Sequence, residues 1–446
     1  MDYPAPARSR PDERRAQRRY LALAVMVGII AGTIGSMFHL AINALLQWPA
    51  QLRQIVDGPL LVLAAALITM TVTVAAVALV RHWAPEASGS GVQEVEGAMD
   101  GLREIHWTRV LPIKFFAGAA AIGSGLVLGR EGPTIHIGAS VAAMVSARFG
   151  LTATERSGLL AAGAAAGLAC AFNSPIAAVL FVIEEMRRQF PYRYSTYMGV
   201  IIAALLATVV TQWIGGAAPD LVLAAPEVPL PMLPLFVLLG CVLGGVGVAL
   251  NACILKALAF AGAAQERAPY LYPAVVGLLV GALLALSPQT VTGGEALIPA
   301  LVREQPGVVV LLALAAARFC TTVGSYSTGV PGGIFAPILS LAGCVGLAFA
   351  ALASAAMPDA GVVPAAFAIA AMGGLFTASV RAPMVGVVLT LELTGAYGAT
   401  VPLLTTCLAA NLAAQWLGGR PIYEQLLERT LTLAGIKAPA KPANDG

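Results

Sequence analysis

The stretch Gly129-Arg130-Glu131-Gly132-Pro133 places an ionisable pair inside one of the most hydrophobic parts of the chain. Residues 115–128 before it contain no charged side chain, and the next charged side chain after Glu131 is Arg148. A carboxylate at membrane depth is costly unless it binds or pairs with something, so it marks a functional site by default. The glycines let the backbone come close to a ligand. Pro133 suits the first turn of a helix whose free N–H groups would point at Glu131 or at an anion.

The composition around this stretch is that of a membrane protein. Of the 446 residues, 58% are hydrophobic and 11% are charged, and the mean hydropathy is +0.83. Since a span needs roughly 20 apolar residues, the length allows on the order of ten or more hydrophobic segments once loops are subtracted. That leaves no room for an appended soluble domain. We therefore expect an all-α polytopic protein in a lipid bilayer, with no cytoplasmic regulatory domain.

Both ends of the chain are polar. The positive-inside rule predicts that residues 1–19 lie in the cytoplasm, because six arginines precede the first apolar run; they are Arg8, Arg10, Arg14, Arg15, Arg18 and Arg19. The apolar run 20–46 is too long for the hydrophobic region of a secretory signal. The formal charge of +3 comes from this cluster and indicates no nucleic-acid partner. Residues 433–446 are predicted to form a disordered cytoplasmic tail.

The cysteines and histidines predict neither a metal site nor a cofactor. The cysteines stand singly in apolar sequence, without a CxxC pair, as is typical of packing residues; they are Cys170, Cys241, Cys253, Cys320, Cys344 and Cys407. The histidines are scattered and form no HExxH motif; they are His39, His82, His106 and His136.

Many of the apolar segments are shorter than a full span, and several begin at proline. We read the segments at about 21–46, 59–81, 109–128, 133–149, 157–172, 175–190, 195–214, 233–260, 270–287, 307–326, 332–356, 362–378, 384–397 and 399–417. Starts at Pro133, Pro175, Pro331 and Pro383 predict broken and re-entrant helices that begin inside the bilayer. Such helices are tolerated only where they are buried in protein or line a cavity, and their N-termini attract anions.

An internal repeat divides the chain into halves of about 20–215 and 233–432, joined by a Pro-rich linker at 216–232. Residues 167–184 align with residues 374–392 after one insertion, and in both copies a glutamate follows a proline by nine positions. These glutamates are Glu184 and Glu392. Repeats of this kind predict a transporter with inverted-topology halves and a site near the middle of the membrane. Glu131 aligns with Pro331, so only the first half supplies this acid.

Three glycine-rich elements and a late tyrosine complete the pattern. They are Gly89-Ser90-Gly91-Val92, Gly129 to Pro133, Gly333-Ile334-Phe335-Ala336-Pro337 and Arg420-Pro421-Ile422-Tyr423. In this order, with the duplicated core, they closely resemble the chloride channel (CLC) family of anion channels and proton-coupled anion exchangers, over about residues 20–432. The resemblance implies two inverted repeats that meet at a mid-membrane anion site. It also implies a homodimer with one anion pathway per subunit.

The hydroxyl and amide groups of these motifs suit a halide. Ser90 stands between glycines that expose backbone N–H groups, which can replace water around an anion without adding a charge that would hold it too tightly. The resemblance implies that the Ser90 and Tyr423 hydroxyls coordinate the central anion. We extend the expected anion site to Gly89, Gly91, Arg130, Gly132, Gly333, Ile334 and Phe335. The alternatives are a flexible Ser-Gly turn for Ser90 and an interfacial aromatic anchor for Tyr423.

The resemblance implies that Glu131 is the external gate and a proton acceptor. An ionised carboxylate can occupy an anion site in place of the substrate and leave it on protonation, which couples protons to anions. The alternative is a salt bridge to Arg130 in a surface loop. Glu185 matches the family's internal proton-transfer glutamate, and the arginines after it predict a cytoplasmic helix end. Its alternative is that Glu184 and Glu185 form ion pairs with Arg187 and Arg188 at the membrane edge.

The other polar residues of the core are expected to be structural. Glu96 and Lys114 are predicted to pair, and Glu392 to cap or pair internally. A hydrogen-bonded helix histidine is the favoured interpretation of His136, and tuning of the gate's response to pH is the alternative. The family's first motif usually ends in proline, and here Gln93 takes that place. Because Ser90 is kept, we expect chloride rather than nitrate or fluoride.

These features favour an inner-membrane, multi-pass antiporter of chloride and protons with a cytoplasmic N-terminus, and not an enzyme. A passive voltage- or pH-gated chloride channel of the same architecture is the nearest alternative. An intramembrane serine hydrolase would use Ser88 or Ser90, but His106, the nearest candidate base, has no motif to place it. A sodium-coupled transporter of organic solutes would explain the repeats but not Glu131 and the family motifs.

Overall fold

The computed structural model describes residues 11–216, 221, 223 and 228–436, and within them the regular secondary structure is helical, with two isolated β-bridges in the loops. The first half contains α1 (Pro11–Leu45), α2 (Trp48–Ile55), α3 (Gly58–Trp83), α4 (Val92–Met99), α5 (Trp107–Gly123), α6 (Glu131–Phe149), α7 (Ala153–Phe172), α8 (Pro175–Glu184) and α9 (Tyr194–Gly215). The second half contains α10 (Leu233–Arg267), α11 (Leu271–Leu286), α12 (Leu297–Glu304), α13 (Val308–Tyr326), α14 (Phe335–Ala356), α15 (Pro364–Val380), α16 (Pro383–Thr394), α17 (Thr400–Trp416) and α18 (Ile422–Leu433).

Several expectations about the ends and the linker fall outside the described residues. Of the basic segment 1–19, residues 11–19 belong to α1 and continue into the first apolar stretch as one helix. Residues 433–436 of the expected disordered tail are described, as the end of α18 and a turn, and residues 437–446 are not. Within the linker 216–232, residues 217–220, 222 and 224–227 are not described.

Helix lengths confirm a polytopic membrane protein. Among the described residues, seven helical stretches are long and apolar enough to cross a membrane; they are Glu13–Ile55, Gly58–Trp83, Tyr194–Gly215, Leu230–Arg267, Val308–Tyr326, Phe335–Ala356 and Tyr397–Trp416. Shorter apolar helices include α8 and α16, with 10 and 12 residues. A helix of 12 residues is about 18 Å long and cannot cross the roughly 30 Å hydrocarbon core. The expected broken helices are therefore present.

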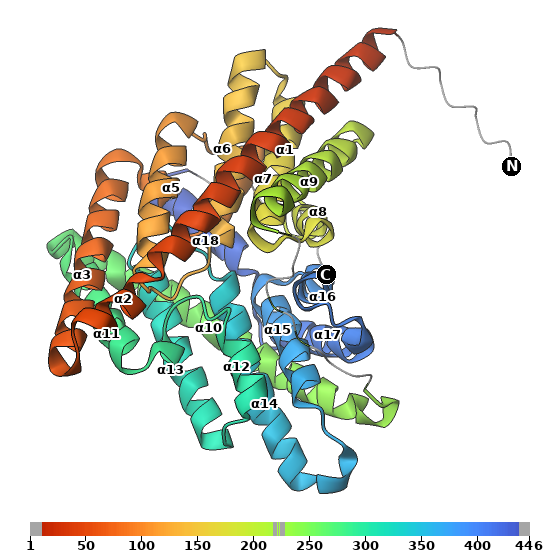
Figure 1. The fold of residues 1–446 in the computed structure, drawn as a ribbon. Coiled ribbons are helices and arrows are strands. Elements are labelled where there is room, and N and C mark those ends of the chain that lie inside the picture. Colours follow the sequence, from red (N-terminus) through yellow and green to blue (C-terminus); the bar gives the residue numbers. More distant parts are fainter. Residues whose placement is uncertain (1–10, 217–220, 222, 224–227, 437–446) are drawn as a thin grey trace, which may run out of the picture.

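The repeat is visible in how the two broken helices are made. Asn173 directly follows α7 and Arg381 directly follows α15, and both residues adopt a left-handed conformation with φ of 52° and 70°. In each case a proline two residues later starts the next helix, α8 or α16. α8 and α16 lie side by side, one from each half (Figure 1). The same chain reversal is thus used twice and brings the halves together.

Two other helix starts differ from the expected ones. Helix α6 begins at Glu131 and α14 begins at Phe335, whereas starts at Pro133 and Pro331 were expected. Pro133 and Pro337 each occupy the third position of their helix. Proline is tolerated there because the first-turn N–H groups have no partner inside the helix. The correction matters because it places Glu131 in the first turn of α6.

The glycine-rich loops join the two halves through backbone hydrogen bonds. The N–H of Gly129 donates to the Gly333 carbonyl at 2.8 Å, and the Gly333 N–H donates back to the Gly129 carbonyl at 2.7 Å. A second bridge pairs Gly89 with Pro331: the Gly89 N–H donates to the Val330 carbonyl at 3.1 Å. The loops before α4, α6 and α14 consequently meet in one place at the centre of the protein.

Candidate functional site: a junction of helix N-termini

Four helices begin at this junction, and each carries a predicted site residue in or just before its first turn. Ser90 precedes α4, Glu131 starts α6, Phe335 starts α14, and Tyr423 is the second residue of α18. Figure 1 shows α18 running through the middle of the molecule, and it packs against α4 and α15. The first N–H groups of each helix lack intrahelical partners and carry partial positive charge, so the junction favours an anion.

Glu131 lies within this junction and is completely buried, with 0% of its surface exposed. Its Oε2 lies beside Gly129 and Gly333; a Cβ added to Gly333 would lie 3.4 Å from it. Neither carboxylate oxygen has a hydrogen-bond partner within the described residues. The alternative of a surface loop is therefore wrong. A buried polar atom without a partner is costly, and its presence indicates that another species completes the site.

Ser90 and Tyr423 are also fully buried, and neither hydroxyl has a hydrogen-bond partner in the part of the chain that the structure describes. The Ser90 Oγ faces the backbone of Gly132, where any added Cβ would collide with it. Ser90, Glu131 and Glu185 all lie near enough to interact electrostatically with the Tyr423 hydroxyl. Two hydroxyl groups and one carboxylate thus lie close together without forming hydrogen bonds to one another. The interfacial-anchor alternative is therefore wrong for Tyr423, and Ser90 is buried in the protein rather than part of a solvent-exposed loop.

The backbone around Ser90 requires glycine. Gly89 and Gly91 have φ values of 62° and 90°, a region that side chains with a Cβ rarely adopt. A Cβ on Gly91 would also press against the ring of His136. Lys114 fixes the loop from the other side, because its Nζ donates to the carbonyls of Ala87 at 3.0 Å and Gly89 at 2.8 Å. Lys114 thus holds the two carbonyls of this loop in place.

Phe335 fills the space between the junction and the core. Its ring contacts those of Phe376 and Phe181 edge to face, with centroid separations of 4.9 and 5.5 Å. It also lies 5.9 Å from the Tyr423 ring and 6.3 Å from the Phe172 ring. Packing of this kind holds the start of α14 and the Tyr423 ring in fixed positions. Ile334, just before it, is fully buried.

Some predicted site residues act differently from what the sequence suggested. The N–H groups of Gly89 and Gly333 are occupied by the bridges between the halves, so these two groups are not anion donors. The Arg130 guanidinium donates to the Ala171 carbonyl at 3.0 Å and lies 2.8 Å from the His39 ring and 3.6 Å from Glu295. These contacts hold Arg130 beside the junction and direct its side chain toward α1 and α7.

Glu185 follows the end of α8 and is partly buried near three other acids, Glu96, Glu184 and Glu424. Glu184 does more than pair with the neighbouring arginines: its carboxylate accepts backbone N–H groups of α16, Val385 at 2.8 Å and Met384 at 3.2 Å, and Arg187 also lies near enough to attract it. For Glu185 the alternative stays open.

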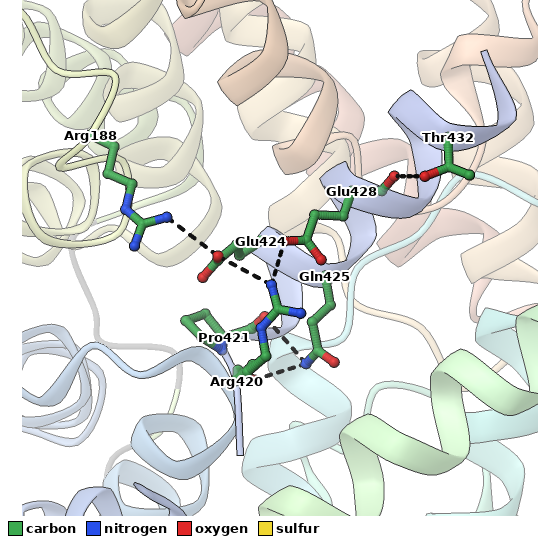
Figure 2. A network of polar contacts seen from close by, with 7 residues as sticks. All are labelled: Arg188, Arg420, Pro421, Glu424, Gln425, Glu428 and Thr432. Atoms are coloured by element: carbon green, nitrogen blue, oxygen red, sulfur yellow. Dashed lines mark hydrogen bonds and ion pairs between the residues drawn. The ribbon is translucent and has the colours of Figure 1, made fainter. Parts of the chain in front are cut away.

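An ion-pair network beside Glu185 fixes the helix that carries Tyr423. Arg188, just beyond α8, lies 3.3 Å from Glu424 on α18, and Arg420 lies 3.2 Å from the same carboxylate (Figure 2). Arg420 also pairs with Glu428, and this hydrogen bond is the main cause that raises the pKa of Arg420. Gln425 donates to the Arg420 carbonyl at 2.9 Å (Figure 2). The network therefore ties α18 to the segment that follows Glu185.

Two other expectations about core residues are wrong. Lys114 does not pair with Glu96, since its Nζ is used by the carbonyls of Ala87 and Gly89. Both ring nitrogens of His136 are buried without a hydrogen-bond partner among the described residues. His136 is therefore not the hydrogen-bonded helix histidine that we expected. Its tuning of the response to pH stays a prediction.

A cavity of about 410 Å³ reaches the loop before α4 from one side. Its wall includes Gly89, Gln93, Tyr326, Leu426 and Arg429. Tyr326, at the end of α13, was missed by the sequence reasoning, because a single tyrosine at the end of an apolar helix carries no motif. The cavity thus reaches Gly89, the residue before Ser90. Among the described residues, no group of three or more His, Cys, Asp or Glu side chains could hold a metal ion.

Known proteins share both the sequence and this architecture. The model of the voltage-gated chloride channel family matches residues 72–415. A Vibrio parahaemolyticus protein named H(+)/Cl(-) exchange transporter ClcA is 43% identical over 433 residues, which cover 95% of this chain and 92% of the relative. A protein of the same name from Vibrio cholerae is 44% identical over 420 residues, 92% of this chain and 89% of the relative.

Solved structures agree with the sequence matches. The structure of a slow cyanobacterial Cl-/H+ antiporter has a TM-score of 0.89 and 37% identity, and the match covers 93% of this chain and 98% of that one. A CLC-type fluoride/proton antiporter, 20% identical with a TM-score of 0.72 over 91% of this chain and 96% of its own, shares the fold. The chain belongs to the voltage-gated chloride channel (CLC) family.

Proposed function

We propose that this protein is a secondary transporter that exchanges chloride for protons across the membrane. The observation that carries the proposal is the convergence of the Ser90 and Tyr423 hydroxyls with the Glu131 carboxylate, all buried and without hydrogen-bond partners among the residues that the structure describes. Hydroxyl groups and helix N-termini bind an anion without a full positive charge, which suits an ion that must also leave. The relatives of similar length that are named as H(+)/Cl(-) exchange transporters support the choice of substrates.

Glu131 supplies the coupling in this proposal. As a carboxylate it occupies the junction in place of an anion, since both are attracted by the same helix N-termini. As a neutral acid it loses that attraction and withdraws, so that chloride enters. Each cycle of the side chain therefore exchanges one kind of ion for the other. The structure corrects the expected alignment of Glu131 with Pro331: Phe335 starts α14 as Glu131 starts α6, so the second half places a phenylalanine where the first places the acid, and we propose one such gate in each subunit.

Glu185 transfers protons between Glu131 and the cytoplasmic side. The support is its place after α8, near Glu96, Glu184 and Glu424, and its electrostatic contact with the Tyr423 hydroxyl. Neighbouring acids favour a proton that is shared among them, because two adjacent carboxylates resist being ionised together. The proposal places the N-terminus in the cytoplasm of an inner-membrane protein, on the strength of the arginines before α1.

We further propose a homodimer in which each subunit has its own pathway. All groups of the junction come from one chain, so no residue of a partner is needed to complete it. The exposed apolar side chains of α8, α9, α16 and α17 offer a surface for a second copy or for lipid; they include Ile176, Trp213, Met384, Val401 and Leu408.

The reversal potential of the purified full-length protein in liposomes tests the proposal. With equal chloride on both sides and a pH gradient of one unit, an antiporter has a reversal potential displaced from zero, because protons contribute to the coupled flux. A passive chloride channel has a reversal potential of zero under the same conditions. A reversal potential of zero with a measurable chloride current would support the channel instead. If the protein carried no chloride current at all, both the antiporter and the channel would be excluded.

A further inference from the structure

Gln93 is a buried amide with no evident structural task. It is the second residue of α4, 7% exposed, and its Oε1 is buried without a hydrogen-bond partner among the described residues. An unpaired buried amide is unfavourable, since it loses the hydrogen bonds that water would give. No packing benefit explains it, because an aliphatic side chain of similar size would fill the same space. The unpartnered Oε1 is an acceptor and can meet only a donor such as water, so the group that can meet an anion from the cavity is the Nε2.

The position of Gln93 connects the cavity of about 410 Å³ with the loop that holds Ser90. Both Gly89 and Gln93 line this cavity. The Nε2 of Gln93 lies beside Gly89, since a Cβ built on that glycine would be 3.9 Å from it and 3.4 Å from the Tyr326 hydroxyl. Gln93 therefore lies where the cavity meets the loop that holds Ser90. The carboxamide N–H of Gln93 can donate a hydrogen bond to an anion at this point.

The charges around the cavity favour an anion at this point. Two acids line the wall, but each is paired: Glu94 with Arg103 at 2.9 Å, and Glu86 with Arg109 at 2.6 Å. Arg429 is also in the wall and donates to the Leu258 carbonyl at 3.2 Å, which leaves its charge to act on the cavity. A cavity with paired acids and an additional cation attracts negative ions.

We propose that the Gln93 carboxamide is an additional anion ligand, which donates a hydrogen bond to the ion as it passes between the cavity and Ser90. The inference rests on the proposed function, because it takes the junction as the anion pathway. A donor at this point stabilises ions of high charge density more than large, weakly hydrated ones. Gln93 therefore raises the affinity for chloride and the preference for chloride over thiocyanate.

Gln93→Leu tests the proposal, because leucine keeps the bulk of the side chain and removes its donor. Equilibrium binding of chloride and of thiocyanate to the purified full-length protein is measured by titration calorimetry. We expect the chloride dissociation constant to rise by about 3- to 10-fold, as for the loss of one hydrogen bond, and that of thiocyanate to change by less than about 2-fold. Thr430→Val, a change at another polar position of the same cavity wall, is the matched control and should bind both ions like the unmodified protein.

A second variant keeps the test decisive if Gln93→Leu does not fold. Gln93→Asn keeps the carboxamide but shortens the side chain by one methylene. It should also raise the chloride dissociation constant. Chloride affinity and selectivity like those of the unmodified protein, in a folded variant, would overturn the role of Gln93. Equal weakening of chloride and thiocyanate would overturn it too. Coupled chloride and proton flux of the unmodified protein in the same preparation separates these outcomes from a failure of the proposed function, because that flux tests the exchange itself and involves no change at Gln93.

Discussion

Glu184 and Glu392 each cap the helix that carries the other. Glu184, the last residue of α8, accepts the N–H groups of Met384 and Val385 at the start of α16. Glu392, near the end of α16, accepts those of Ile176 and Ala177 at the start of α8, at 3.3 and 2.8 Å. The exchange follows from the internal repeat, and it satisfies the free N–H groups of two short helices at once.

Removal of either cap is predicted to destabilise the protein. Glu184→Gln and Glu392→Gln should each lower the stability by about 1 kcal/mol, because the amide keeps one acceptor oxygen but loses the charge and sets an NH2 group against the second backbone N–H. Because each glutamate caps a different helix of the same pair, the double variant should lose more stability than either single variant. Thermal unfolding of the detergent-solubilised protein measures this. Glu304→Gln at an exposed position is the control, and an equal shift in the control would contradict the role of the caps.

Close packing of α6 against α7 is predicted to tolerate no side chain at Gly138 or Gly167. A Cβ on Gly138 would collide with the Gly163 carbonyl, and one on Gly167 with the Thr134 carbonyl. Both collisions are with backbone, so Gly138→Ala should cost about 1–3 kcal/mol and displace the start of α6. Gly215→Ala meets no atom within 4 Å and is the control. A Gly138→Ala protein that melts like the control would show that the helices can separate freely.

Arg318 is predicted to be essential for the loop between α11 and α12. It is fully buried, and its guanidinium donates to the carbonyls of Gln289, Val291 and Thr292 and to the Ser340 hydroxyl of α14. Arg318→Met keeps much of the volume and leaves these acceptors unpaired, so stability should fall by about 3 kcal/mol or more. Lysine cannot reproduce the fork of donors and should rescue little.

Protein yield and thermal unfolding check the Arg318 variants. Arg303→Met, in which an exposed arginine is removed, is the control and should melt like the unmodified protein. Full stability of Arg318→Lys would contradict the need for several donors.

Glu185→Gln is predicted to suppress proton flux and to spare chloride flux. The amide has a similar shape but takes up no proton, so transfer along the acids near α8 should stop, while Ser90 and Tyr423 still bind chloride. Both fluxes are recorded in the same liposomes, and the chloride flux serves as the internal control. Unchanged proton flux would refute the role of Glu185.

Residues with a motif could be predicted from the sequence, and residues that act through distant contacts could not. Glu131, Ser90 and Tyr423 stood out because a charge, a glycine-flanked serine and a late tyrosine are conspicuous in apolar sequence. Arg318 and Tyr326 carried no signal, since their partners are 20 or more residues away or belong to other helices. Broken helices were predicted correctly at Pro175 and Pro383, where a left-handed residue and a proline mark the break locally.

Predictions about single contacts failed where several partners competed for one group. Lys114 was expected to pair with Glu96, but two carbonyls of the Ser90 loop take all its described contacts. The Gly333 N–H was expected to face an anion, but the Gly129 carbonyl binds it. In both cases the competing partner is a backbone group, which the side-chain pattern of a sequence does not reveal.

Glu131→Gln tests the central claim most directly. Glutamine keeps the shape of the buried side chain and removes its titration, so anion movement should continue without coupling to protons. The measurement is the reversal potential of the reconstituted variant under a pH gradient with equal chloride on both sides. We expect it to fall to zero while chloride current persists. A reversal potential that stays displaced from zero, as in the unmodified protein, would contradict the assignment of Glu131 as the gate.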